Sequence, residues 1–189
     1  GLQPHLKRRL AYSTISNLSY VLFGVVMMNP LGMAAALVHM VFHAVMKICA
    51  FFCAGAIMHK TGKNYVYELG GLGRQMPVTF ACFTAAGLSL MGIPLFAGFI
   101  SKWNLAESAA AAGGAMGVTA VGVLLYSALM TGVYMMTVTV RALFPSAGER
   151  AASAAARTEP GWRMLAPMVF FACLLVVFGL YSEPLVRFM

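Results

Sequence analysis

The chain has 189 residues, of which 61% are hydrophobic and only 10% are charged. Soluble globular domains carry about 25% charged residues, so this composition excludes a water-soluble domain and indicates an integral membrane protein. The formal net charge of +8 arises from 13 Lys and Arg residues against 5 Asp and Glu residues.

Apolar windows of about 20 residues, the length that crosses a bilayer, predict an all-α membrane protein with five transmembrane helices. Helices are expected because lipid offers the backbone no hydrogen-bond partners. The predicted spans are residues 10–28, 31–58, 77–100, 117–140 and 164–181. The first span is polar over residues 12–20, so we expect it to face protein inside a larger helical bundle.

The basic residues predict the orientation of these spans, because cytoplasmic loops carry an excess of Lys and Arg. Ten of the 13 basic residues fall on one side of the predicted spans, and only Arg187 falls on the other side. The ten are Lys7, Arg8, Arg9, Lys60, Lys63, Arg74, Arg141, Arg150, Arg157 and Arg163. We therefore expect a plasma-membrane protein with a cytoplasmic N-terminus and an external C-terminus. Because topology accounts for the net charge, nucleic acid is not an expected partner.

The spans divide the chain into two predicted parts. Residues 1–112 hold three spans, and residues 113–189 hold two more, joined by a cytoplasmic Ala- and Arg-containing connector at 145–160. The chain begins with Gly1 directly before a basic helix entry, which favours the C-terminal part of a longer polypeptide.

The cysteines do not predict a disulfide framework. All four lie in predicted spans: Cys49, Cys53, Cys82 and Cys173. We interpret them as small packing residues.

The second span contains His39, His43 and Lys47, spaced four residues apart in an otherwise apolar segment. This spacing places the three side chains along one helix face, with about 6 Å of axial rise between neighbours. Ionisable residues inside a membrane are by default functional candidates. The row therefore predicts a proton relay.

Two other readings of these histidines remain open. The pair His39 and His43 has the spacing of two metal ligands, but zinc requires a third or fourth ligand and the chain contains no Asp. Either histidine could instead be a core residue with satisfied hydrogen bonds.

The third span is expected to break. Pro94 lacks a backbone donor, and Gly92 and Gly98 relax the backbone on either side of it. Broken helices mark ion or substrate sites in transporters, and Lys102 would lie just beyond this break. The alternative is a straight helix that leaves the bilayer near Ile100, with Lys102 in an interfacial cluster.

Four motifs in this order carry a family resemblance. They are residues 6–16 (LKRRLAYSTIS), the His39-x3-His43-x3-Lys47 helix, residues 69–77 (LGGLGRQMP), and residues 92–103 (GIPLFAGFISKW). Between Lys7 and Glu107 the chain resembles the antiporter-like membrane subunits shared by respiratory complex I, membrane-bound hydrogenases and Mrp-type sodium/proton antiporters. The last two spans match that family only in hydropathy.

The resemblance implies the last five of fourteen helices, including the second of two inverted repeats. Lys47, His43 and His39 would then line a proton half-channel, and Lys102 would be the exit-side proton carrier at the broken helix. The family commonly has two adjacent prolines at the break, where this chain has Pro94 followed by Leu95. It also often has a histidine or glutamine where this chain has Asn17, so we assign Asn17 no transfer role.

These observations predict proton or cation/proton translocation within a multisubunit complex. The expected partners are other membrane subunits, lipid, protons and possibly Na⁺. The resemblance is to a subunit of a redox-driven translocase or an antiporter, and we expect no cofactor, metal or redox centre in this chain. The alternative is a structural subunit that anchors its neighbours without conducting.

Overall fold

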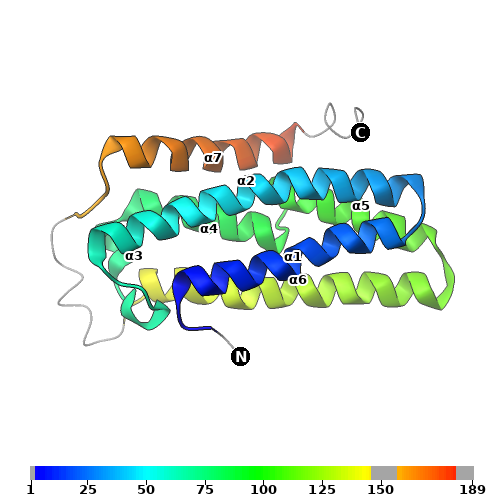
Figure 1. Ribbon diagram of the computed structural model, residues 1–189, viewed down its shortest axis with the longest axis horizontal. Helices are drawn as coiled ribbons and strands as arrows, with labels where there is room; N and C mark the ends of the chain where they lie inside the picture. Colours follow the sequence, from blue (N-terminus) through cyan, green and yellow to red (C-terminus); the bar gives the residue numbers. More distant parts are fainter. Residues whose placement is uncertain (1–2, 146–156, 182–189) are drawn as a thin grey trace.

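A computed structural model describes residues 3–145 and 157–181 of the chain (Figure 1). These residues form seven α-helices and one 3-10 turn, and no β-strand lies among them. The elements are α1 (Leu6–Val26), α2 (Pro30–Thr61), η1 (Val66–Glu68), α3 (Leu72–Gln75), α4 (Pro77–Met91), α5 (Ala97–Ala111), α6 (Gly114–Leu143) and α7 (Trp162–Leu180). The all-helical class predicted from the composition is confirmed.

The long helix α2 is the centre of the bundle. It contacts α1, α4, α5 and α7, while α4 and α5 also contact α6 on their other side. In Figure 1 the helices run roughly parallel or antiparallel to the long axis, and α7 forms one edge of the molecule. Because four helices contact α2, its polar side chains His39, His43 and Lys47 are buried.

Among the described residues three helices are long and apolar enough to cross a membrane: Pro30–Thr61, Gly114–Leu143 and Trp162–Leu180. The helix Pro77–Met91 is apolar but shorter. Four of the predicted spans correspond to single helices whose ends differ by a few residues, whereas the span 77–100 corresponds to α4 and the first part of α5. Length and composition do not establish the count of five crossings.

Helix α1 begins earlier than predicted, at Leu6 rather than residue 10. Its start is fixed by the chain on either side of η1, since Leu6 N donates to Asn64 O at 2.9 Å and Val66 N donates to Pro4 O at 2.8 Å. Arg9 therefore lies inside the helix and is only 6% exposed. Counting Arg9 among the loop cations was wrong, because the first turn of the helix carries it into the bundle.

The predicted break in the third span is confirmed as a helix interruption. Helix α4 ends at Met91, α5 starts at Ala97, and the chain between them turns at Gly92 (φ 91°) and Leu95 (φ 79°). The left-handed conformation is strained for a residue with a side chain, and Leu95 occupies the position where a second proline was expected. Gly92 adopts it without that cost.

The two half-helices cap one another across the break. Ser89 Oγ of α4 accepts a hydrogen bond from Gly98 N of α5 at 3.2 Å. In the other direction Lys102 Nζ of α5 donates to Leu90 O at 2.6 Å and Met91 O at 3.3 Å. These bonds satisfy Leu90 O, Met91 O and Gly98 N, which the break leaves without partners inside their helices.

A glutamate far along the chain caps the start of α4. Glu159 Oε1 accepts from Val78 N at 2.6 Å, and Glu159 Oε2 accepts from Thr79 Oγ1 at 2.8 Å. Carboxylates stabilise helix N-termini because they pair with free N–H groups and oppose the helix dipole. This contact fixes the segment before α7 to the start of the broken helix.

Part of the predicted connector, residues 146–156 with Arg150, lies outside the described residues, as does Arg187. The division of the chain at residue 112 stays a prediction.

Gly98→Ala should destabilise the bundle, because an added Cβ would lie 1.7 Å from Ser89 O. Overpacking of this kind costs about 1–3 kcal/mol, which should lower the thermal unfolding midpoint of the detergent-solubilised protein by several degrees. Gly122→Ala is the matched control, because nothing lies within 4 Å of that Cβ position. Equal midpoints for the two variants would contradict the close approach of α4 and α5.

Glu159→Ala should also lower the unfolding midpoint, by the loss of about 1 kcal/mol that removal of an N-terminal cap produces. Glu159→Gln, which keeps an acceptor oxygen, should retain part of that stability. The control is Glu107→Ala, since Glu107 is exposed on α5. If Glu159→Ala unfolds at the same temperature as the control, the cap contributes nothing.

Candidate functional site

The predicted row on α2 is buried along its whole length. His39 is 0% exposed, His43 is 4% exposed and Lys47 is 6% exposed. The rings of His39 and His43 stack with their centroids 5.9 Å apart. The four-residue spacing therefore produces one continuous polar row inside an apolar bundle.

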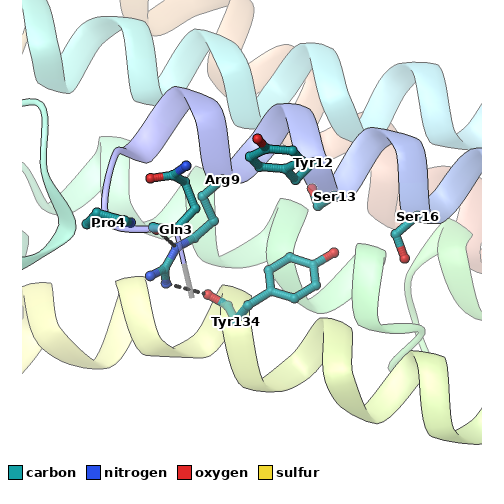
Figure 2. A pocket seen from close by; sticks show the side chains of 7 residues that line it. All are labelled: Gln3, Pro4, Arg9, Tyr12, Ser13, Ser16 and Tyr134. Carbon is teal, nitrogen blue, oxygen red and sulfur yellow. Dashed lines mark hydrogen bonds between the residues drawn. The ribbon is translucent and has the colours of Figure 1, made fainter. Parts of the chain in front are cut away.

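At one end of the row, Lys47 is held by α1. Its Nζ donates to Leu10 O at 3.0 Å and to Ser13 Oγ. Ser13 itself donates to Leu10 O at 2.9 Å and also borders a cavity of about 550 Å³ beside α1 and α6 (Figure 2). The ammonium is thus solvated by a carbonyl and a hydroxyl, next to a space large enough for several waters.

His43, in the middle of the row, is buried without a hydrogen-bond partner. Within residues 3–145 and 157–181, neither Nδ1 nor Nε2 of this ring has one. Buried polar side-chain atoms are satisfied in the large majority of cases. Water fits such a ring, because one nitrogen of neutral imidazole donates and the other accepts.

His39 connects the row to α5. Its Nδ1 lies 2.9 Å from Ser101 Oγ, and which atom donates depends on the histidine tautomer. When His39 Nδ1 is the donor, the single hydrogen of Ser101 Oγ is free to bond Gly98 O at 3.2 Å, at the start of α5. On the other side, the ring of Tyr20 meets His39 edge-on with centroids 5.3 Å apart.

Lys102 follows Ser101 directly and reaches back over the break. Besides its bonds to Leu90 O and Met91 O, its Nζ lies 4.8 Å from the centroid of the Tyr20 ring. Carbonyls at a helix C-terminus and an aromatic face both stabilise a cation. The straight helix of the alternative is wrong, because α4 ends at Met91 and α5 begins at Ala97. The neighbour of Lys102, Trp103, is 60% exposed.

The four predicted residues are thus brought together by α2, α5 and α1. The order in space is Lys47, His43, His39 and then, through Ser101 and Tyr20, Lys102. The described glutamates lie elsewhere, since Glu68 and Glu159 accept from backbone N–H groups and Glu107 is exposed.

Sequence reasoning missed three side chains of this site: Ser13, Tyr20 and Ser101. Ser13 and Tyr20 belong to the polar half of the first predicted span, whose polarity was the available signal. Asn17 lies between them on α1, is 0% exposed and donates to Ser13 O at 2.8 Å. Its bond is structural, and no transfer role is assigned to it.

The described part of the chain brings no third His, Cys, Asp or Glu ligand to these histidines. Among the described residues no group of three or more His, Cys, Asp or Glu side chains could hold a metal ion. Cys49, Cys53 and Cys82 are buried in α2 and α4 as free thiols, and Cys173 is exposed.

Comparison with known proteins extends the resemblance seen in the four motifs. The family described as NADH:quinone oxidoreductase/Mrp antiporter, TM matches residues 2–126. NADH-quinone oxidoreductase subunit N of Desulforudis audaxviator is 34% identical over 97% of this chain and 38% of its own length. Subunit L of the NADH-quinone oxidoreductase of Mycobacterium tuberculosis is 38% identical over 74% of this chain and 22% of its own length.

Two solved structures share the fold. A chain of the Mrp complex from Dietzia sp. DQ12-45-1b has a TM-score of 0.85 over 97% of this chain and 41% of its own, at 22% identity. A chain of the membrane-bound sulfane sulfur reductase, an archaeal respiratory membrane complex, has a TM-score of 0.81 at 31% identity. That match covers 94% of this chain and 28% of the other.

The chain spans about two-fifths or less of the length of these relatives. The similarity to the subunit N relative covers 97% of this chain, so it reaches beyond Glu107 into the last two predicted spans. The four motifs did not extend into those spans, which resembled the family only in hydropathy. From the family match over residues 2–126 and the relative at 34% identity, the chain belongs to the NADH:quinone oxidoreductase/Mrp antiporter family of membrane subunits.

Proposed function

We propose that this chain translocates protons, or exchanges protons for another cation, as a membrane subunit of a multisubunit respiratory or antiporter complex. The observation that carries the proposal is the buried row of Lys47, His43 and His39 together with the partly buried Lys102 beyond it. Each member can gain or lose a proton, and packing gives no reason for four such groups to lie together in an apolar bundle.

The proton would move between these groups through short steps. His43 stacks on His39 at 5.9 Å, and His39 lies 2.9 Å from the hydroxyl that precedes Lys102. A hydroxyl both donates and accepts, so Ser101 can pass a proton between the imidazole and the half-helix junction. The unpartnered nitrogens of His43 mark where an ordered water would join Lys47 to the rest of the row.

The break between α4 and α5 supports a role for Lys102 as the exit-side carrier. Charged Lys102 stabilises the carbonyl ends of α4, and that stabilisation weakens when the ammonium loses its proton. Proton departure and the geometry of the break are thereby coupled. The strained Leu95 lies inside the same turn.

An external source of free energy would drive the transfer. Moving one charge against 100 mV costs about 2.3 kcal/mol, and the sequence holds no cofactor motif that could supply it. Redox chemistry or an opposing ion gradient in other subunits would therefore bias the lysines.

The membrane arrangement we propose has five crossings, with α4 and α5 together forming one of them. The loop that follows α2 lies beside the start of α1 and the end of α6, since Leu6 N bonds Asn64 O and Arg141 Nε bonds Tyr67 O at 3.2 Å. This gathers Lys7, Lys63, Arg74 and Arg141 at one end of the bundle. By the positive-inside rule that end would face the cytoplasm.

A structural role is the second candidate, and one observation favours it. Both lysines bind backbone carbonyls of another segment, Lys47 on α1 and Lys102 on α4. Buried cations of this kind can hold helices together without conducting. The two candidates differ in whether removal of a side chain abolishes assembly or flux.

Lys47→Ala should abolish proton flux through the reconstituted complex, measured with a pH-sensitive dye in proteoliposomes, while the complex still assembles. The matched control is Lys60→Ala, which removes an exposed lysine from the same helix. Loss of assembly with Lys47→Ala would support the structural role, and normal flux would refute the relay. Repeating the assay with and without Na⁺ separates proton movement from cation exchange.

His43→Phe separates the two candidates further, because this ring has no hydrogen bond to lose within the described residues and phenylalanine preserves the stack on His39. The unfolding midpoint should change little, since one planar ring replaces another and no hydrogen bond between described residues is lost. Flux should fall about a hundredfold, as for loss of a proton-transferring side chain. His59→Phe, at the exposed end of α2, is the control.

A further inference from the structure

A polar cavity opens beside α1 and α6, outside the row of proton-exchanging groups. Its volume is about 550 Å³, and it is lined by Gln3, Pro4, Arg9, Tyr12, Ser13, Ser16 and Tyr134 (Figure 2). Ser13 belongs to the site already described through its bond to Lys47. The other polar lining residues have no part in the proposed proton path.

Arg9 is a buried charge held by neutral groups. Its Nε donates to Gln3 O at 2.7 Å and its Nη1 donates to Tyr134 O at 3.1 Å, as Figure 2 shows. In the described part of the chain no carboxylate pairs with it. A guanidinium stays charged at any physiological pH, and a buried charge costs several kcal/mol unless a counter-ion compensates it.

The face of α1 beside the cavity is polar and uncovered. Tyr12, Ser16 and Ser19 follow one another at helical spacing, and Tyr12 is 62% exposed. Within the described residues, the hydroxyls of Tyr12 and Ser16 have no hydrogen-bond partner. Lipid tails cannot bond these groups, and polar residues of membrane helices face protein.

The length of this stripe distinguishes a helix from a phospholipid as its occupant. From Arg9 to Ser19 the helix rises about 15 Å. A phosphate headgroup could pair with Arg9, but its acyl chains would then cover Ser16 and leave its hydroxyl unpaired, whereas the Ser19 hydroxyl donates to Ile15 O at 3.3 Å. A second helix can present a carboxylate at one level and hydrogen-bonding side chains or small residues along the next two turns.

We infer that a membrane helix carrying an Asp or Glu side chain docks on this face of α1. Its carboxylate enters the cavity and pairs with Arg9, and its polar side chains meet Tyr12 and Ser16. The contact serves assembly, so it goes beyond the proposed proton transfer and does not depend on it.

The first test uses a photo-crosslinking amino acid, p-benzoylphenylalanine, placed at Tyr12 in the complex in native membranes. The matched control replaces Tyr126, which is 64% exposed on α6. The product expected at Tyr12 is a peptide from a membrane helix with Asp or Glu within one turn of the cross-link, identified by mass spectrometry. The control should not give that peptide. Adducts of phospholipid alone at Tyr12, or a peptide without a nearby carboxylate, would overturn the inference.

The second test reverses the charge. Arg9→Glu should lower the yield of assembled complex on a native gel about tenfold or more, as expected when a buried charge pair is broken. Arg8→Glu makes the same change at an exposed position one residue away and should assemble normally. Changing the cross-linked carboxylate to Arg in the Arg9→Glu background should restore assembly.

The two tests remain decisive if Arg9→Glu fails to fold, because the cross-link from Tyr12 is measured with Arg9 intact. Equal assembly of Arg9→Glu and Arg8→Glu, or no rescue by the exchanged charge in a folded variant, would refute the pairing.

Discussion

Positive charge drawn into the helix bundle is the constraint on which this structure depends. Among the described residues, three cationic side chains lie there without a carboxylate partner: Arg9 and Lys47, which are buried, and Lys102, which is partly buried. Each binds backbone carbonyls of other residues. Arg9 binds those of Gln3 and Tyr134, Lys47 binds that of Leu10, and Lys102 binds those of Leu90 and Met91. A carbonyl is a fixed dipole that solvates a cation without a full opposing charge. Groups held in this way can exchange a proton more readily than groups locked in ion pairs, except for the guanidinium of Arg9, which stays charged.

The broken helix follows from the same constraint. An uninterrupted helix satisfies its own carbonyls and would leave Lys102 without acceptors. The interruption at Gly92 to Phe96 frees the carbonyls of Leu90 and Met91, and the side chain of Lys102 has the length to reach them. Ser89 completes the exchange by accepting from Gly98 N. The interruption is only partly covered by its neighbours, since α7 contacts both α4 and α5 while Pro94 and Leu95 are exposed.

The three cations differ in what surrounds them, and this separates their roles. Lys47 and Lys102 stand at the two ends of a row of imidazoles and hydroxyls, whereas Arg9 lies outside that row and lines the cavity that Ser13 also borders. His39 and His43, in the middle of the row, are closed in by this chain's own helices. The cavity and the polar stripe beside it are open, so they belong to contacts made by another helix.

The sequence determined the helical class, the central row and the break. Composition excludes any soluble fold, four-residue spacing puts His39, His43 and Lys47 on one face, and glycines around Pro94 interrupt a helix wherever it is packed. These are local properties, because they depend on periodicity and backbone sterics. Four ordered motifs also sufficed to identify the family.

Only the tertiary structure decided what these groups touch. From α1, Ser13 binds Lys47 at a separation of 34 residues in the chain, and Tyr20 meets His39 at a separation of 19 residues. From α5, Ser101 meets His39 at a separation of 62 residues. The burial of Arg9 likewise depends on Tyr134, 125 residues away. No local pattern predicts such pairs, because helix packing selects them through the fit of whole surfaces.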